Sequence, residues 1–107
     1  MNNCVFTGYL VENPISSYQG NVLKVEFIIV TYTYRTVKKT GEKTRIPTYI
    51  HCEAWHTGAE TIEKNTKAGT KITIQSSAKH YSQEDEALVF RVNEFDICDH
   101  ETQEENW

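Results

Sequence analysis

The chain has 107 residues, of which 38% are hydrophobic, and its formal net charge is −4. This length favours one domain, and the longest apolar run is far too short for a transmembrane helix (Phe27 to Val30). The N-terminal segment MNNCVFTGYL has no basic region and no cleavage site of small residues, so we expect no signal peptide. Three scattered cysteines argue against a disulfide framework and favour a reducing cytoplasm (Cys4, Cys52 and Cys98).

Charge is distributed unevenly along the chain. Residues 96–107 hold five acidic side chains and no Lys or Arg, whereas residues 1–95 hold 11 basic and 10 acidic side chains. Between Tyr32 and Tyr49, a cluster of basic side chains is opposed by Glu42 alone. The sequence therefore predicts a nearly neutral body, one basic hairpin and an acidic tail. The overall acidity does not by itself exclude a nucleic-acid partner, because the distribution of charge matters more than its sum.

The first half of the chain predicts two strands. Residues 4–11 are rich in β-branched and aromatic types and stop at the turn signal Asn13-Pro14. Residues 22–34 form a longer strand with alternating faces, and Thr40-Gly41-Glu42 is expected at a hairpin tip. One face of the long strand carries Leu23, Val25, Phe27 and Ile29, and the other carries Lys24, Glu26, Tyr32 and Tyr34.

The second half predicts three strands and a helix. Residues 45–56 alternate again, with Pro47 expected near the strand start or at an edge. Residues 58–67 favour a short helix that depends on packing for its stability, and residues 71–78 and 87–97 read as strands. In the third strand, Ile50, Cys52 and Ala54 share one face, and Tyr49, His51, Glu53 and Trp55 share the other.

The resulting order is β-β-β-α-β-β. It is the order of an OB-fold, an all-β, five-stranded Greek-key barrel, here with one short helix between the third and fourth strands. We expect one OB-fold domain over residues 1–98 and a short acidic tail over residues 99–107.

Five short motifs follow one another along the chain. They are NCVFTGYL (3–10), NP (13–14), FIIV (27–30), AWHTGAE (54–60) and KAGTKI (67–72). In this order they resemble motifs of the bacterial and phage single-stranded-DNA-binding protein family, over about residues 3–97. The family usually has Gly at the positions of His56 and Ser76, and its long Gly/Pro/Gln linker has no counterpart in this chain.

That family stacks DNA bases on aromatic side chains, so the resemblance implies the same role for aromatic residues here. They are Tyr34 or Tyr32, Tyr49, Trp55 and Tyr81. Tyr49 and Trp55 are six residues apart on a strand, so they share a face, opposite the apolar one. Exposed rings suit base stacking because every base has a π-face. The alternative is that these rings pack a subunit interface or cap the end of the barrel.

Basic side chains interleave with these tyrosines and would track phosphates, a contact that is blind to sequence and sensitive to salt. They are Arg35, Lys38, Lys39, Lys43 and Arg45, with Lys79 and Arg91 as further candidates. The alternative is an ordinary solvated hairpin. His51 is a candidate phosphate or base contact. It faces away from Cys52 on the strand, and no CxxC or HxxxH spacing occurs, so we expect neither a metal nor a cofactor.

These features predict a protein that binds and protects single-stranded DNA without sequence specificity in replication, recombination or repair. The resemblance implies a homo-oligomer, a tetramer or a dimer, in the cytoplasm of a bacterial or phage-infected cell. The acidic tail ending in Trp107 would dock onto a replication or repair protein, or else be a frayed terminus. Stacking on aromatic rings does not distinguish RNA from DNA.

Two other classes of function remain as alternatives. One is a protein-interaction or primosome-type module whose aromatic face is a protein interface. The other is an enzyme, but we find no nucleophile–base pair, and the neighbouring acids Glu84, Asp85 and Glu86 favour a solvated loop over a cation site. We therefore expect no catalytic activity.

Overall fold

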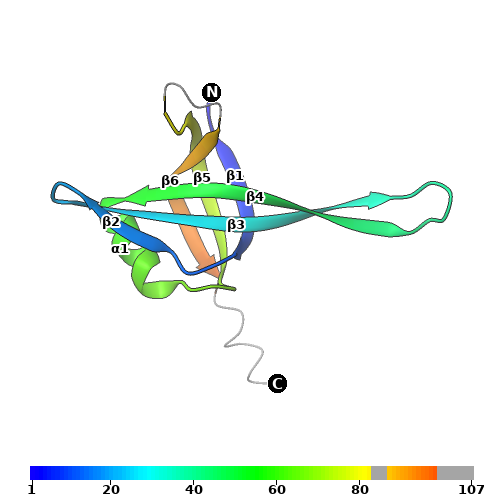
Figure 1. The fold of residues 1–107 in the computed structure, drawn as a ribbon, viewed down its shortest axis with the longest axis horizontal. Coiled ribbons are helices and arrows are strands. Elements are labelled where there is room, and N and C mark those ends of the chain that lie inside the picture. Colours follow the sequence, from blue (N-terminus) through cyan, green and yellow to red (C-terminus); the bar gives the residue numbers. More distant parts are fainter. Residues whose placement is uncertain (83–86, 99–107) are drawn as a thin grey trace, which may run out of the picture.

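The computed structural model describes residues 1–82 and 87–98, which form six strands and one helix (Figure 1). The elements are β1 (Cys4–Leu10), β2 (Ile15–Gln19), β3 (Val22–Thr36), β4 (Lys43–Trp55), α1 (His56–Asn65), β5 (Lys71–His80) and β6 (Leu88–Cys98). The five predicted strands and the helix are all present, and the predicted all-β barrel is confirmed.

The structure adds one strand that the sequence analysis missed. β2 pairs with the start of β3 through a tight turn at Gly20, whose φ is +66°. Its sequence, ISSYQ, lacks an alternating apolar face, and four of its five residues are exposed. β2 is an edge strand that contributes little to the core, which is why its residues carry no recognisable strand signal. Because β2 precedes the long strand, the helix lies between β4 and β5.

The strands form one sheet in the order β1-β5-β6-β4-β3-β2, which closes through an extra pairing of β1 with β3. Tyr9 pairs with Val30 and Leu10 with Ile29 at this closure. β4 and β6 run parallel, and all the other pairings are antiparallel. The barrel therefore has one side made of β3 and β4 and another made of β1, β5 and β6.

The interior of the barrel is filled by the apolar faces predicted from alternation. The buried side chains include Leu23, Val25, Phe27, Ile29, Ile50, Cys52, Ala54, Ile72 and Ile74. Phe6 and Phe90 add an edge-to-face contact with ring centroids 5.0 Å apart. Burial raises the pKa of the Cys52 thiol to about 12, so Cys52 acts as a small apolar core residue. From α1, Ala59 and Ile62 are fully buried against this core.

Ser76, which stands where the related family usually has Gly, is fully buried in β5 beside a β-bulge. Its hydroxyl donates a hydrogen bond of 2.9 Å to the carbonyl oxygen of Cys4 on β1. The buried hydroxyl is therefore satisfied, and this replacement of Gly is accommodated without an unpaired polar group.

β3 and β4 continue well beyond the barrel as a two-stranded ribbon, seen at the right of Figure 1. We call residues 32–48 the hairpin arm; every one of its residues is exposed. Its tip turns through Gly41, whose φ is +72°, and is held by a 2.8 Å hydrogen bond from the Val37 amide to the Glu42 carbonyl. The predicted hairpin tip is thus confirmed. Pro47 lies in this ribbon opposite Tyr32, which agrees with its expected place at an edge.

α1 begins at His56, two residues before the predicted start, and His56 is the single non-glycine residue with positive φ (+59°) among those that the structure describes. A left-handed backbone costs a residue with a Cβ roughly 1–2 kcal/mol. The family resemblance pointed to Gly at this position, and the backbone geometry gives the reason. His56 therefore carries local strain at the junction between Trp55 and the helix.

Replacing His56 with glycine should stabilise the fold. We expect His56→Gly to unfold at higher denaturant concentration than His56→Ala, with a difference of about 1 kcal/mol in the free energy of unfolding. Both variants remove the imidazole, but only glycine relieves the left-handed backbone. Equal stabilities for the two variants would show that the backbone at this position is not strained.

Candidate nucleic-acid interface

The outward-facing residues of β3 and β4, which we call the outer face, form four cross-strand pairs over the barrel. The pairs are Lys24 with Trp55, Glu26 with Glu53, Ile28 with His51 and Val30 with Tyr49. Alternation fixes this arrangement, because the residues between them fill the core. The outer face thus presents one tryptophan, one tyrosine and one histidine in a row along β4.

Trp55 is the aromatic residue of this row that has cations on both sides. It is half-buried, whereas Tyr49 and His51 are exposed. The Nζ of Lys24 on β3 lies 5.4 Å from the centroid of the Trp55 ring, and the Cζ of Arg91 on β6 lies 5.8 Å from it. Both are within the range of a cation–π contact. The two cations reach Trp55 from the strands on either side of β4.

Glu53 lies beneath this cluster and is only 2% exposed. Its Oε2 accepts a 2.7 Å hydrogen bond from the indole Nε1 of Trp55 and forms a 2.9 Å ion pair with the Nζ of Lys79. Burial raises the pKa of the Glu53 carboxyl, but these two hydrogen bonds and the charges of Lys79 and Lys24 outweigh that effect. The net result is a pKa below the ordinary value, so Glu53 is ionised at neutral pH.

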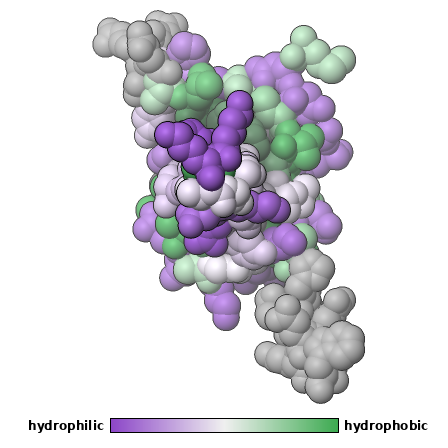
Figure 2. Space-filling model, turned by 90° about the vertical axis from the view of Figure 1, so that its right-hand side faces the viewer, coloured by the Kyte–Doolittle hydropathy of each residue, from purple (hydrophilic) through white to green (hydrophobic). Residues whose placement is uncertain are grey.

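The hairpin arm continues the aromatic and basic pattern away from the barrel. The guanidinium carbon of Arg45 lies 4.1 Å from the ring centroid of Tyr32, and Tyr34 pairs with Arg45 across the strands. Arg35, Lys38, Lys39 and Lys43 are exposed along the arm. Figure 2 views the molecule from the end of the arm, where the surface nearest the viewer is mostly hydrophilic.

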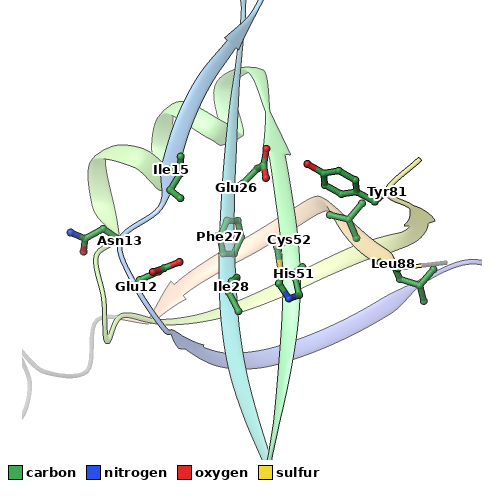
Figure 3. A pocket seen from close by; sticks show the side chains of 12 residues that line it. Glu12, Asn13, Ile15, Glu26, Phe27, Ile28, His51, Cys52, Tyr81 and Leu88 are labelled. Atoms are coloured by element: carbon green, nitrogen blue, oxygen red, sulfur yellow. The ribbon is translucent and has the colours of Figure 1, made fainter. Parts of the chain in front are cut away.

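A hollow of about 330 Å³ opens beside the outer face (Figure 3). Glu26, Ile28 and His51 line it from β3 and β4, while Tyr81 and Leu88 line it from the ends of the β5–β6 connection. The segment between β1 and β2 completes the wall with Glu12 and Asn13, together with Ile15 at the start of β2. Pockets of 300–1,000 Å³ are typical of small-molecule sites, so this one is of the size of a single small group.

The structure brings most of the predicted site residues onto one continuous surface. Tyr49, His51, Trp55 and Arg91 lie together over the barrel, Tyr81 lies beside them at the hollow, and the arm carries the remaining tyrosines and cations. Lys79 differs from the others, because it forms the ion pair with the buried Glu53. Its charge is therefore largely compensated within the protein.

Sequence reasoning missed Lys24 and Glu53 as members of this cluster. A usable signal existed for Lys24: counting the strand register outward from the hairpin tip pairs it with Trp55. For Glu53, alternation gave the face that it shares with Trp55, but not its contact with Lys79, which depends on how β5 lies relative to β4. The lining of the hollow was missed for the same reason.

The structure offers no metal centre: within residues 1–82 and 87–98, no three His, Cys, Asp or Glu side chains are grouped so that they could hold an ion. No helix in this part of the chain is long and apolar enough to cross a membrane. The predicted acidic loop residues Glu84, Asp85 and Glu86 and the predicted tail over residues 99–107 lie outside the described residues.

Comparison with known proteins identifies the family of this chain. A family model described as "Single-strand binding protein family" matches residues 1–102. The chain belongs to the single-strand binding protein family. No curated protein matches the chain.

Two solved structures have a similar fold. The wild-type single-stranded DNA binding protein from Thermus aquaticus matches with a TM-score of 0.77, 15% identity, 92% coverage of this chain and 50% of its own. A deletion mutant of the same protein (delta 228-252, R190A) gives the same TM-score and identity, with 51% of its own chain covered. This chain thus spans about half the length of those proteins. At 15% identity the similarity establishes the shared fold.

Proposed function

We propose that this chain binds single-stranded DNA without sequence preference and coats it during replication, recombination or repair. The observation that carries the proposal is the continuous surface of exposed rings and cations formed by the outer face and the hairpin arm. In OB-folds the equivalent strands and the adjoining loops form the oligonucleotide-binding surface. Family membership and the titles of the Thermus aquaticus proteins agree with this ligand.

Stacking on rings would supply the contacts to bases. Tyr49 is 56% exposed and Trp55 is half-buried, so each offers ring surface to a flat base. Each stacked base is typically worth about 1–3 kcal/mol. Tyr32 and Tyr34 would extend the row along the arm. Because any base can stack, this mode needs no particular sequence.

Cations beside the rings would supply the contacts to phosphates. Lys24 and Arg91 flank Trp55, and His51 lies on the same face between Trp55 and Tyr49. On the arm, Arg35, Lys38, Lys39, Lys43 and Arg45 would follow the backbone of the strand. Such contacts neutralise phosphates and release counterions, which makes binding weaken as salt rises.

The hollow beside Tyr81 would accept a single base. Its walls combine the apolar side chains Ile28 and Leu88 with the acids Glu12 and Glu26. Carboxylates repel phosphate, so the sugar–phosphate backbone would pass outside the hollow while a base enters it. Tyr81, which is 59% exposed, would provide the ring at its edge.

Titration with poly-dT at low and at high salt tests the proposal, with intrinsic Trp and Tyr fluorescence as the signal. We expect strong, saturable quenching at low salt that weakens as salt is added. Absence of quenching at low salt would refute the proposal. It would indicate instead that protein already covers the aromatic outer face.

Reversing two charges at the tip of the hairpin arm tests whether the arm contacts the phosphates of the DNA. Lys38→Glu combined with Lys39→Glu should weaken binding and flatten the dependence of log K on log salt. The expected change in slope is about 0.7 for each phosphate that the variant no longer neutralises. Isothermal titrations at several salt concentrations give this slope.

The matched control makes the same change in net charge at another place on the protein. Lys64→Glu combined with Lys67→Glu alters two exposed lysines at the end of α1 and just beyond it. That control should keep most of the salt slope. If the slope were unchanged in the arm variant, or if the arm variant and the control variant had equal effects, the arm would not be part of the DNA-binding surface.

A homo-oligomer, a dimer or a tetramer, is part of the proposal. Val5 and Tyr9 share the outward side of β1 and are 60% and 44% exposed, so together they offer apolar surface for a contact between copies. Sedimentation measurements would give the assembly state. The role proposed for the tail ending in Trp107, docking onto a replication or repair protein, stays a prediction.

A protein-interaction module is the second candidate, favoured by the net charge of −4 and by the acids Glu12 and Glu26 at the hollow. In that case the aromatic outer face would be covered by protein. The poly-dT titration distinguishes the two candidates, because covered rings would not be quenched by DNA.

A further inference from the structure

Glu53 is a buried carboxylate on the outer face of β4, between two side chains that both reach solvent more than it does. It is 2% exposed, whereas Tyr49 and His51 on the same face are exposed. Burying a charge is costly unless it is paired and hydrogen-bonded, and a well-packed apolar side chain would often serve stability as well or better. The reason for an acid at this position therefore lies in what it contacts.

Both contacts of Glu53 converge on one oxygen atom. Oε2 accepts the hydrogen bond from Trp55 Nε1 at 2.7 Å and lies 2.9 Å from Lys79 Nζ. The indole N–H is the only polar group of a tryptophan side chain and acts only as a donor. Because Trp55 lies two residues further along the same strand, its ring is fixed at the backbone and again at Nε1.

Lys79 makes this tether strong. Its ammonium group pairs with the carboxylate from β5, so Glu53 is charged when it accepts the indole N–H, and hydrogen bonds to a charged acceptor are shorter and stronger than neutral ones. Lys24 and Arg91 lie near the ring from β3 and β6, at 5.4 and 5.8 Å. The cluster therefore joins four strands around a single ring.

We propose that Glu53 is a positioning residue, which holds the indole of Trp55 in the orientation that accepts a DNA base, and that Lys79 serves as its counter-ion and not as a phosphate contact. This inference rests on the proposed function. A ring that is already ordered loses less conformational freedom when a base stacks on it. Glu53 thus acts on DNA only through Trp55.

Three variants separate orientation from charge, all built with Trp107→Phe so that Trp55 is the only tryptophan. Glu53→Met removes the acceptor but keeps a side chain of similar length. Glu53→Gln keeps an acceptor oxygen and removes the charge. Glu60→Gln is the control, because it removes one acid at an exposed position of α1, outside the outer face and outside the hollow.

Two readouts are needed: the fluorescence anisotropy decay of Trp55 in the DNA-free protein, and the Kd for a labelled oligo-dT. We expect Glu53→Met to increase the mobility of the Trp55 ring and to raise Kd about three- to tenfold, a part of one stacking contact. Glu53→Gln should lie between Glu53→Met and the parent protein in both readouts, because it keeps an acceptor for the indole N–H and loses the charge that strengthens the bond. Glu60→Gln should leave both readouts close to those of the parent protein, because Glu60 lies outside the proposed binding surface.

The inference is overturned if Glu53→Met leaves both the ring mobility and Kd unchanged, or if Glu53→Gln binds as weakly as Glu53→Met. If Glu53→Met does not fold, Trp55→Phe replaces it, since that variant keeps a ring and loses the N–H donor. Trp55→Phe should bind more weakly, and adding Glu53→Gln to it should cost nothing further. Binding by Trp55→Phe as tight as that of the parent would also overturn the inference.

Failure of the proposed function gives a different result. If the parent protein does not bind oligo-dT at low salt, the DNA proposal is wrong, whatever the variants do. The anisotropy decay without DNA then still reports whether Glu53 orders the Trp55 ring.

Discussion

Replacing Trp55 with alanine should weaken the binding of oligo-dT by about 1–3 kcal/mol, or roughly five- to 150-fold in Kd. The variant removes the central ring of the outer face and also the group that Lys24 and Arg91 flank. Anisotropy of a labelled oligonucleotide is the suitable measurement, because the substitution removes the tryptophan whose fluorescence would report stacking. The barrel should remain folded, since Trp55 lies outside the core.

Tyr18→Ala is the matched control for the Trp55 variant. Tyr18 is 71% exposed on β2 and pairs with Leu23, so it belongs to the sheet face opposite to that of Lys24 and Trp55. This variant should bind DNA as the wild type does. Equal losses of affinity in the two variants would show that the outer face has no special role. A loss of stability in Trp55→Ala as large as its loss of affinity would assign the ring to the fold and not to DNA.

Replacing Gly8 with alanine should destabilise the barrel by about 3 kcal/mol, at the upper end of the usual cost of overpacking. A Cβ at this position would lie 2.4 Å from the carbonyl oxygen of Val30 and 3.1 Å from Cγ2 of Thr31. The first of these atoms belongs to the backbone of β3, so it has no rotamer by which to move away. Gly8 lies where β1 meets β3 and the barrel closes. Denaturant unfolding monitored by circular dichroism gives the change.

Gly58→Ala is the control for Gly8→Ala. The Cβ added in α1 would meet only Cε1 of Phe95, at an ordinary contact distance of 3.5 Å. Alanine is favoured over glycine in a helix by roughly 1 kcal/mol, so this variant should be as stable as the wild type or more stable. If Gly8→Ala unfolded at the wild-type midpoint, β1 and β3 would not approach each other as closely as the structure has them.

Much of the interface could be predicted from the sequence, because strand alternation is a local property. The apolar set Ile50, Cys52 and Ala54 assigns Tyr49 and Trp55 to the outer face, and the structure has them there. The hairpin tip was equally accessible, since Gly41 in a charged segment is a local turn signal. For both features the pattern is contained within a few neighbouring residues.

Other features depend on contacts between distant segments and left no local pattern. The ion pair between Glu53 and Lys79 joins residues 26 positions apart on strands whose order in the sheet cannot be counted from the sequence. The hollow unites the segment before β2 with the two ends of the β5–β6 connection. β2 was missed because an edge strand with little burial has no apolar face to recognise.

The hairpin arm has one more physical consequence. A ribbon of two strands has two open edges, whose unpaired N–H and C=O groups are templates for adding a foreign strand. In the described part of the chain, no third strand pairs with the arm. Pro47 lacks an N–H to offer, and the lysines and arginines repel a second copy of the same ribbon. Added salt screens that repulsion, so the conditions that release DNA would also favour self-association of the protein through its arm.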